Sequence, residues 1–167
     1  MGDAASYLVI GLGNEFRCDD GCGPLVARLI DQKRCAGVKI IQPLSDGTGM
    51  VMEWSGADAA FVVDSVRSGA APGRIFRFEP LVETIPETVF RPTSTHRLGI
   101  TQIVRLAQAL GRLPQRLIVY GIEGTNFEHG TDMTPAVIKA AQDVAERIAS
   151  EVSRLARATC PSGEAQP

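Results

Sequence analysis

The sequence has no excess of charge of either sign and no apolar segment at its start that could anchor it in a membrane. Its 17 basic and 19 acidic residues give a net charge of −2, so no basic surface for nucleic acid or an anionic membrane is indicated. The N-terminus has no basic segment, and its apolar run is too short for a signal peptide or a membrane span. We therefore expect a cytoplasmic protein that binds neither nucleic acid nor membranes.

Cysteine is scarce as well. Four cysteines at irregular spacing are too few for a disulfide framework. Cys18 and Cys22 flank a pair of aspartates, which raises the possibility of a zinc or redox site. No second Cys or His pair completes such a site, so we expect reduced thiols that serve as small buried side chains.

The usual nucleotide and hydrolase motifs are also absent. A glycine-rich stretch, GLGNEFRCDDGCGP, begins at Gly11, but Phe16 stands where a dinucleotide fingerprint needs its third glycine. Asp19 and Asp20 would moreover repel a pyrophosphate. The chain contains no P-loop Gly-Lys-Ser/Thr, no Gly-x-Ser-x-Gly and no HExxH. A nucleotide- or metabolite-binding α/β module is therefore kept only as an alternative.

Apolar runs alternate with amphipathic stretches along most of the chain, which is typical of an α/β fold. The predicted strands are residues 7–12, 38–42, 59–64, 74–79 and 116–122, with 74–79 at an edge. The predicted helices are residues 24–32, 97–110 and a final helix that begins at Pro135 with Thr134 as its N-cap. We predict a three-layer sandwich in which helices cover both faces of a twisted, mainly parallel sheet of about five strands.

The composition is uniform, and 167 residues are enough for one domain with its own core. We assign residues 1–157 to a single α/β domain. Residues 158–167 are small, include two prolines and follow no pattern, so we expect a disordered tail there.

Three side chains stand out at the ends of predicted elements. Asp20 follows the first strand, Asp64 ends the third, and His96 precedes the helix predicted at 97–110. Each alone also fits a structural role, such as a helix cap or a surface residue. Parallel sheets bind ligands at the carboxyl ends of their strands, where these loops gather. Two carboxylates and an imidazole suit zinc, nickel or iron better than magnesium, in a layout common to hydrolytic metal sites.

GLGNEFRCDDGCGP (11–24), VVDSV (62–66) and STHRLG (94–99), in this order, resemble the hydrogenase maturation endopeptidases. The resemblance covers most of the chain, including DGTGM (46–50) and the segment before the last helix. It implies an endopeptidase that removes the C-terminal extension from the large-subunit precursor of a nickel–iron hydrogenase after nickel insertion. The nickel comes with that precursor and serves as the recognition element, so we expect no tightly held cofactor.

The resemblance assigns both metal recognition and catalysis to Asp20, Asp64 and His96. It leaves open whether an aspartate activates water directly, as in an aspartyl protease, or whether the bound nickel polarises the water or the scissile carbonyl. Three ligands without a cysteine cage favour weak nickel binding by the isolated protein. A non-proteolytic nickel chaperone is the other alternative, and tight binding would favour it.

Substrate contacts are predicted from loops. Gly13 allows a tight turn, Asn14 holds that turn by side-chain bonds, and Gly47 lets its loop approach a peptide backbone. The predicted contacts are Gly13, Asn14, Asp46 and Gly47, and more widely the loops 45–56 and 80–96. The expected partner is the hydrogenase precursor, and we expect the protein itself to be a monomer.

Overall fold

Five strands of one sheet organise the described part of the chain, which comprises residues 6–41, 48–90 and 99–159 of a computed structural model. The strands are β1 (Tyr7–Gly11), β2 (Val38–Ile41), β3 (Ala59–Val66), β4 (Ile75–Phe78) and β5 (Arg116–Glu123). Their order is β2-β1-β3-β5-β4; β4 runs antiparallel to β5, and the other neighbours are parallel. The predicted mainly parallel sheet and its edge strand are therefore confirmed.

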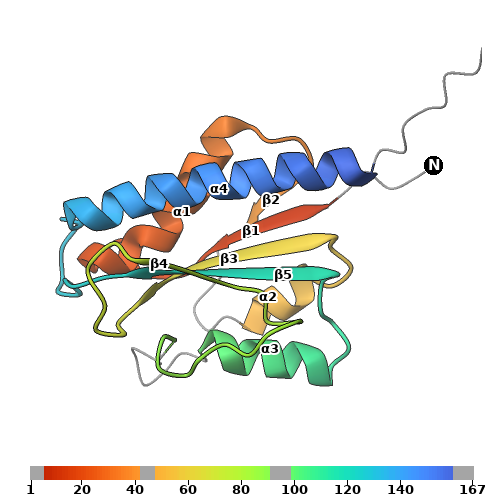
Figure 1. Ribbon diagram of the computed structural model, residues 1–167, viewed down its shortest axis with the longest axis horizontal. Helices are drawn as coiled ribbons and strands as arrows, with labels where there is room; N and C mark the ends of the chain where they lie inside the picture. The colour runs from red at the N-terminus through yellow and green to blue at the C-terminus, as the bar shows by residue number, and fades with distance from the viewer. Residues whose placement is uncertain (1–5, 42–47, 91–98, 160–167) are drawn as a thin grey trace, which may run out of the picture.

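Helices cover both faces of this sheet (Figure 1). The helices α1 (Cys22–Lys33) and α4 (Pro135–Thr159) pack on one face, and α2 (Thr48–Glu53) and α3 (Ile100–Ala109) on the other. Successive strand residues point to opposite faces, so each face has its own core. Buried residues on the α1 and α4 side include Val9, Phe61, Ile118 and Val144, and those on the other side include Ile10, Val62, Val119 and Ile103. The predicted three layers are confirmed.

The strand order reverses at β1, which has β2 on one side and β3 on the other. Open parallel sheets bind ligands outside the carboxyl ends of their strands at such a reversal, so the crevice expected here lies between the ends of β1 and β3. The ends of β1 and β5 and the start of α4 lie at the same edge of the molecule (Figure 1). This edge is where the sequence predicted the functional site.

Strand β3 is longer than predicted. It continues to Val66, two residues beyond Asp64, because Asp64 and Ser65 pair in register with Gly121 and Ile122 of β5. The prediction that the strand ends at Asp64 was therefore wrong. Asp64 lies inside a strand, so the sheet fixes its backbone.

Part of the predicted loop 45–56 is helical. Residues Thr48–Glu53 form α2, and Met50, Val51 and Trp54 are buried in the core beside α3. The prediction of an irregular loop was wrong for these residues, because their apolar side chains at helical spacing are buried between sheet and helix.

The final helix begins at Pro135, as predicted, and buries Val137, Val144 and Ile148. It ends at Thr159, two residues into the segment 158–167 that the sequence predicted to be disordered. None of the helices in the described ranges combines the length and apolarity that crossing a membrane requires.

Glycines bring α1 very close to the sheet. A Cβ atom on Gly23 would lie 2.2 Å from the Leu12 carbonyl oxygen and 2.6 Å from that of Val63. A Cβ atom on Gly11 would lie 2.3 Å from the Gly23 carbonyl oxygen. These two glycines are therefore required by helix–strand packing, and no bound phosphate is needed to explain them.

Replacement of Gly23 by alanine should lower the free energy of unfolding by about 3 kcal/mol, because backbone atoms on two sides cannot move away. Urea denaturation would measure the change. Gly49→Ala is the matched control, since its Cβ would meet nothing within 4 Å, and it should leave stability unchanged or slightly higher. Equal stability of the two variants would contradict this description of the packing.

Candidate active site

Asp20 lies in η1 (Cys18–Gly21), a short 3-10 helix between β1 and α1. Its carboxylate accepts two hydrogen bonds, one from the Ser65 hydroxyl (2.8 Å) to Oδ1 and one from the Asn14 N–H (2.9 Å) to Oδ2. The first bond reaches across to β3, and the second stays within the loop after β1. Asp20 is therefore fixed at the crevice between β1 and β3.

The loop before Asp20 has the conformation that Gly13 and Asn14 predict. Gly13 has φ +120°, and a Cβ there would lie 1.9 Å from the Asp20 carbonyl oxygen, so other residues are excluded. Asn14 Oδ1 accepts a hydrogen bond of 2.9 Å from the Phe16 N–H, which is the turn-holding bond expected of asparagine. Their contact with a substrate stays a prediction.

Asp64 lies next to the residue that holds Asp20. The Ser65 N–H donates to Asp64 Oδ1 at 2.8 Å, while the Ser65 hydroxyl bonds Asp20. Both carboxylates are partly buried. Ser65 therefore links the two acids through its backbone and its side chain.

The thiol of Cys22, at the start of α1, shows that the two acids lie near each other. Burial raises its pKa, and the negative charges of Asp64 and then Asp20 raise this pKa further. Both carboxylates therefore lie within electrostatic range of one buried sulfur. The raised pKa favours the protonated thiol, and neither Cys18 nor Cys22 forms a disulfide.

Asp19, the other half of the aspartate pair, points into the protein. It is fully buried and accepts hydrogen bonds from the N–H groups of Thr125 (2.9 Å), Asn126 (2.9 Å) and Thr134 (2.6 Å), and from the Thr134 hydroxyl (2.8 Å). Burial alone would raise the pKa of Asp19, but these hydrogen bonds outweigh it and hold the pKa below its usual value. Asp19 is therefore a buried, ionised group.

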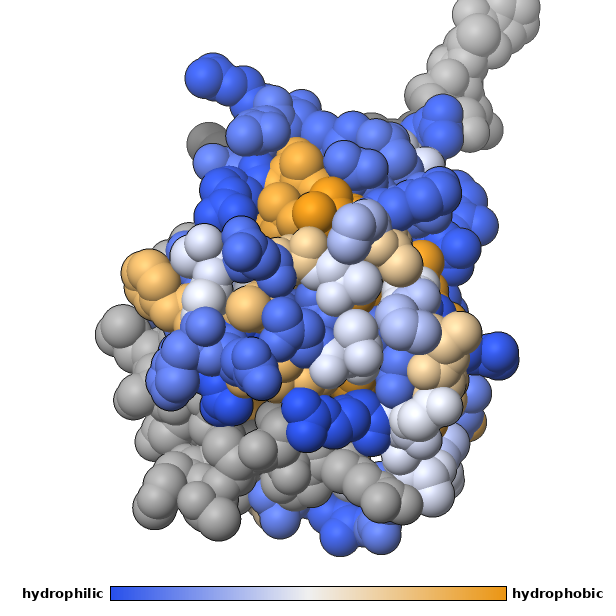
Figure 2. Space-filling view, turned by 90° about the vertical axis from the view of Figure 1, so that its left-hand side faces the viewer, coloured by the Kyte–Doolittle hydropathy of each residue, from blue (hydrophilic) through white to orange (hydrophobic). Residues whose placement is uncertain are grey.

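This carboxylate joins the loop after β1 to the loop after β5. Asp19 also donates its own N–H to the Asn126 carbonyl oxygen at 2.9 Å, and its position beside Thr134 puts a negative charge at the N-terminus of α4. Sequence reasoning missed this role, although the polar Thr-Asn and Thr-Pro pairs in the later loop were a signal. Figure 2 faces this edge, where most of the described surface is hydrophilic.

The structure brings together two of the three predicted catalytic residues, Asp20 and Asp64. His96, Asp46 and Gly47 lie outside the described residues, so their roles stay predictions. Among the residues that are described, no group of three His, Cys, Asp or Glu side chains could hold a metal ion. The described part of the site supplies carboxylate oxygens, which can ligate a divalent cation or accept a proton from water.

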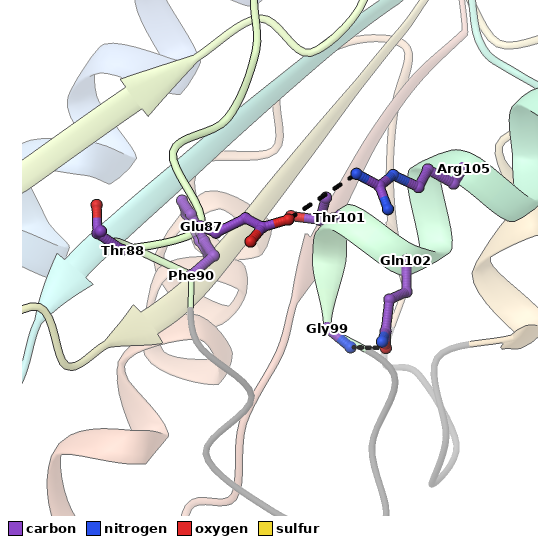
Figure 3. A pocket seen from close by; sticks show the side chains of 7 residues that line it. All are labelled: Glu87, Thr88, Phe90, Gly99, Thr101, Gln102 and Arg105. Atoms are coloured by element: carbon purple, nitrogen blue, oxygen red, sulfur yellow. Dashed lines mark hydrogen bonds and ion pairs between the residues drawn. The ribbon is translucent and has the colours of Figure 1, made fainter.

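A cavity of about 480 Å³ lies beside α3 (Figure 3). Its walls come from the segment after β4 and from the start of α3: Glu87, Thr88, Phe90, Gly99, Thr101, Gln102 and Arg105. Thr101 Oγ1 is buried there without a hydrogen-bond partner among the described residues. Residues 87–90 belong to the predicted substrate loop 80–96, whose contact with the substrate stays a prediction.

Comparisons with known proteins point to one family. A family model described as HycI, hydrogenase maturation protease, matches residues 25–151. The chain is 26% identical over 167 residues to the hydrogenase expression/formation protein HupD of Bradyrhizobium diazoefficiens, covering 95% of this chain and 86% of that protein. It is 22% identical over 144 residues to the hydrogenase 2 maturation protease of Escherichia coli strain K12, and this match covers 84% of this chain and 87% of that protein.

A solved structure shares the fold. The hydrogenase maturating endopeptidase HybD from E. coli superposes with a TM-score of 0.74 at 20% sequence identity, covering 90% of this chain and 93% of that one. The match extends over nearly all of both chains, so the architecture described above is that of these endopeptidases.

Replacement of Asp19 by asparagine should lower the free energy of unfolding at pH 7 by about 3 kcal/mol, because at least one buried donor loses its partner. Since the folded-state pKa of Asp19 lies below its usual value, its charge stabilises the fold above about pH 5. That contribution is lost as the pH falls through the folded-state pKa. The difference between wild type and Asp19→Asn should therefore shrink in acid.

Urea denaturation between about pH 3 and 7 would measure this difference. Asp31→Asn, at an exposed position on α1, is the control and should change stability by no more than about 0.5 kcal/mol. A difference between wild type and Asp19→Asn that grew on acidification would contradict the description of Asp19 as a buried, ionised group.

Proposed function

Since the chain belongs to the hydrogenase maturation protease family, we propose that it removes the C-terminal extension from the large-subunit precursor of a nickel–iron hydrogenase after nickel insertion. The protein is a hydrolase that acts on peptide bonds, as the family's description states. The observation that carries the more specific proposal is the convergence of Asp20 and Asp64 at the crevice between β1 and β3.

The precursor's nickel is treated as part of the substrate. The carboxylates of Asp20 and Asp64 offer oxygen ligands to it, and His96 is the proposed third ligand. Both described acids are partly exposed and anchored through Ser65, which suits a site that contacts a metal held by another protein. A bound nickel would act as a Lewis acid on the reacting groups.

The carboxylate pair supplies the proton transfer that peptide hydrolysis needs. One carboxylate accepts the proton of the attacking water and gives it to the leaving amine. Asp20 is held by the Asn14 N–H and the Ser65 hydroxyl, so it cannot swing out of the crevice. Fixed geometry of this kind lowers the cost of aligning water and peptide.

The alternatives receive less support. The packing of Gly11 against Gly23 accounts for the glycine-rich stretch that suggested a nucleotide. A chaperone would need a tight nickel cage, and among the described residues no group of three His, Cys, Asp or Glu side chains supports one. A cytoplasmic location and a monomeric state stay predictions.

Mass spectrometry of a nickel-loaded large-subunit precursor tests the proposal. Wild-type protein should release one discrete C-terminal peptide from the loaded precursor and none from a nickel-free precursor incubated in parallel. Asp64→Asn and Asp20→Asn should each slow release by at least about 100-fold, because a carboxylate that transfers protons is lost.

The exposed variant Asp31→Asn is the control and should process at the wild-type rate. Cleavage of the nickel-free precursor would discard nickel recognition but keep the peptidase. Normal processing by both site variants would remove Asp20 and Asp64 from the mechanism.

A further inference from the structure

Two arginines flank the pair of acids without being neutralised by them. Arg17 stands three residues before Asp20, and Arg67 three residues after Asp64. Within the described residues neither guanidinium takes part in an ion pair, whereas Arg77 on β4 is paired with Glu151 and Glu79, and Arg116 at the start of β5 is paired with Glu79. The edge that carries the candidate active site therefore has two positive charges that no acidic side chain of the described residues neutralises.

Both guanidinium groups are held by one residue, Phe127. Arg17 donates from Nε (3.3 Å) and Nη2 (3.0 Å) to the Phe127 carbonyl oxygen, and the Arg67 guanidinium lies 4.2 Å from the centre of the Phe127 ring. Phe127 is itself buried, so its position is fixed by the surrounding protein. A guanidinium stacked on a ring keeps its N–H groups at its edge, where a planar carboxylate can bind two of them.

These residues line a shallow cavity that is open to solvent. It has a volume of about 500 Å³ and is lined by Arg17, Arg67, Thr125, Asn126, Phe127 and Glu128. The lining carries two positive charges and one negative charge, from the exposed Glu128, so its net charge is positive. A site of this composition attracts an anion of the size of a carboxylate.

The wall of the cavity is hydrogen-bonded to the loop that carries Asp19 and Asp20. The N–H groups of Thr125 and Asn126 in its wall bind the Asp19 carboxylate, and Asp19 precedes Asp20. Arg67 follows directly after the end of β3, and the three residues from Asp64 to Arg67 correspond to about 10 Å of extended chain. An extended peptide covers this distance in about three residues.

We propose that Arg17 and Arg67 form a subsite for a carboxylate of the substrate chain, about three residues from the peptide bond that is cut. This inference rests on the proposed function and adds a determinant of substrate choice. The carboxylate is either an acidic side chain or the terminal carboxylate of a short extension. Arg67 is a positioning residue, because it binds substrate away from the reacting atoms.

Steady-state kinetics on the nickel-loaded precursor test the subsite. Arg67→Gln should raise KM about five- to tenfold and leave kcat within about twofold, since a charge-assisted hydrogen bond to the substrate is lost. Arg67→Lys keeps the positive charge but lacks the paired N–H donors of arginine, so its KM should lie between that of wild type and that of Arg67→Gln. Arg74→Gln removes another exposed arginine stacked on a ring, that of Phe76, and should match wild type.

Changes in the precursor identify the source of the carboxylate. Each acidic residue near the cut is replaced by its amide, and separately the terminal carboxylate is capped as an amide. The change that raises KM for wild type but not for Arg67→Gln marks the group that binds the subsite. The proposal would be overturned if Arg67→Gln had the KM of wild type. It would also be overturned if no carboxylate change in the precursor reduced the ratio of the Arg67→Gln KM to the wild-type KM.

A binding measurement separates this inference from the proposed function. If wild type does not cleave the precursor, the dissociation constant of the uncut nickel-loaded precursor is compared for wild type, Arg67→Gln and Arg74→Gln. Weaker binding by Arg67→Gln alone would support the subsite while the peptidase proposal fails. Equal binding by all three would overturn the subsite, and normal cleavage with equal KM values would overturn it while the peptidase stands.

Discussion

The burial of the Asp19 carboxylate is the contact on which the rest of the candidate active site depends. An unpaired carboxylate inside a protein would be costly, but four hydrogen bonds from three residues keep this one ionised. Those bonds fix the loop after β1 against the loop after β5 and the first turn of α4. The position of Asp20, the wall of the arginine-lined cavity and the start of the last helix therefore all depend on one side chain.

Two adjacent aspartates have opposite roles here. The backbone turns through η1, so Asp19 points into the protein toward backbone donors, and Asp20 points toward Ser65 and the crevice. Asp19 is held by residues 125–134, whereas Asp20 is held by Ser65 on β3, the strand that carries Asp64. The close packing of Gly11 and Gly23 fixes the first turn of α1 against the ends of β1 and β3.

Much of this arrangement could be predicted from the sequence, because parallel strands buried on both faces are continuous apolar runs and amphipathic helices separate them. Asp20 could be located from its place after the first strand. The end of β3 was predicted two residues too early because a charged residue, Asp64, lies inside the strand. The helix α2 was missed because six residues show little helical periodicity. The role of Asp19 was missed because its partners are 106 to 115 residues away in the chain, and the polar residues of that later loop were the one signal for it.

That long separation has a consequence for how the molecule is made. Contacts between distant parts of a chain form only after the intervening loop closes, which is slow and entropically costly. During synthesis from the N-terminus, β1, α1 and β3 emerge well before residues 125–134, so the loop that carries Asp20 cannot be locked until the last helix begins. The hydrogen bonds that fix Asp19 are thus completed only after the start of the last helix has been synthesised.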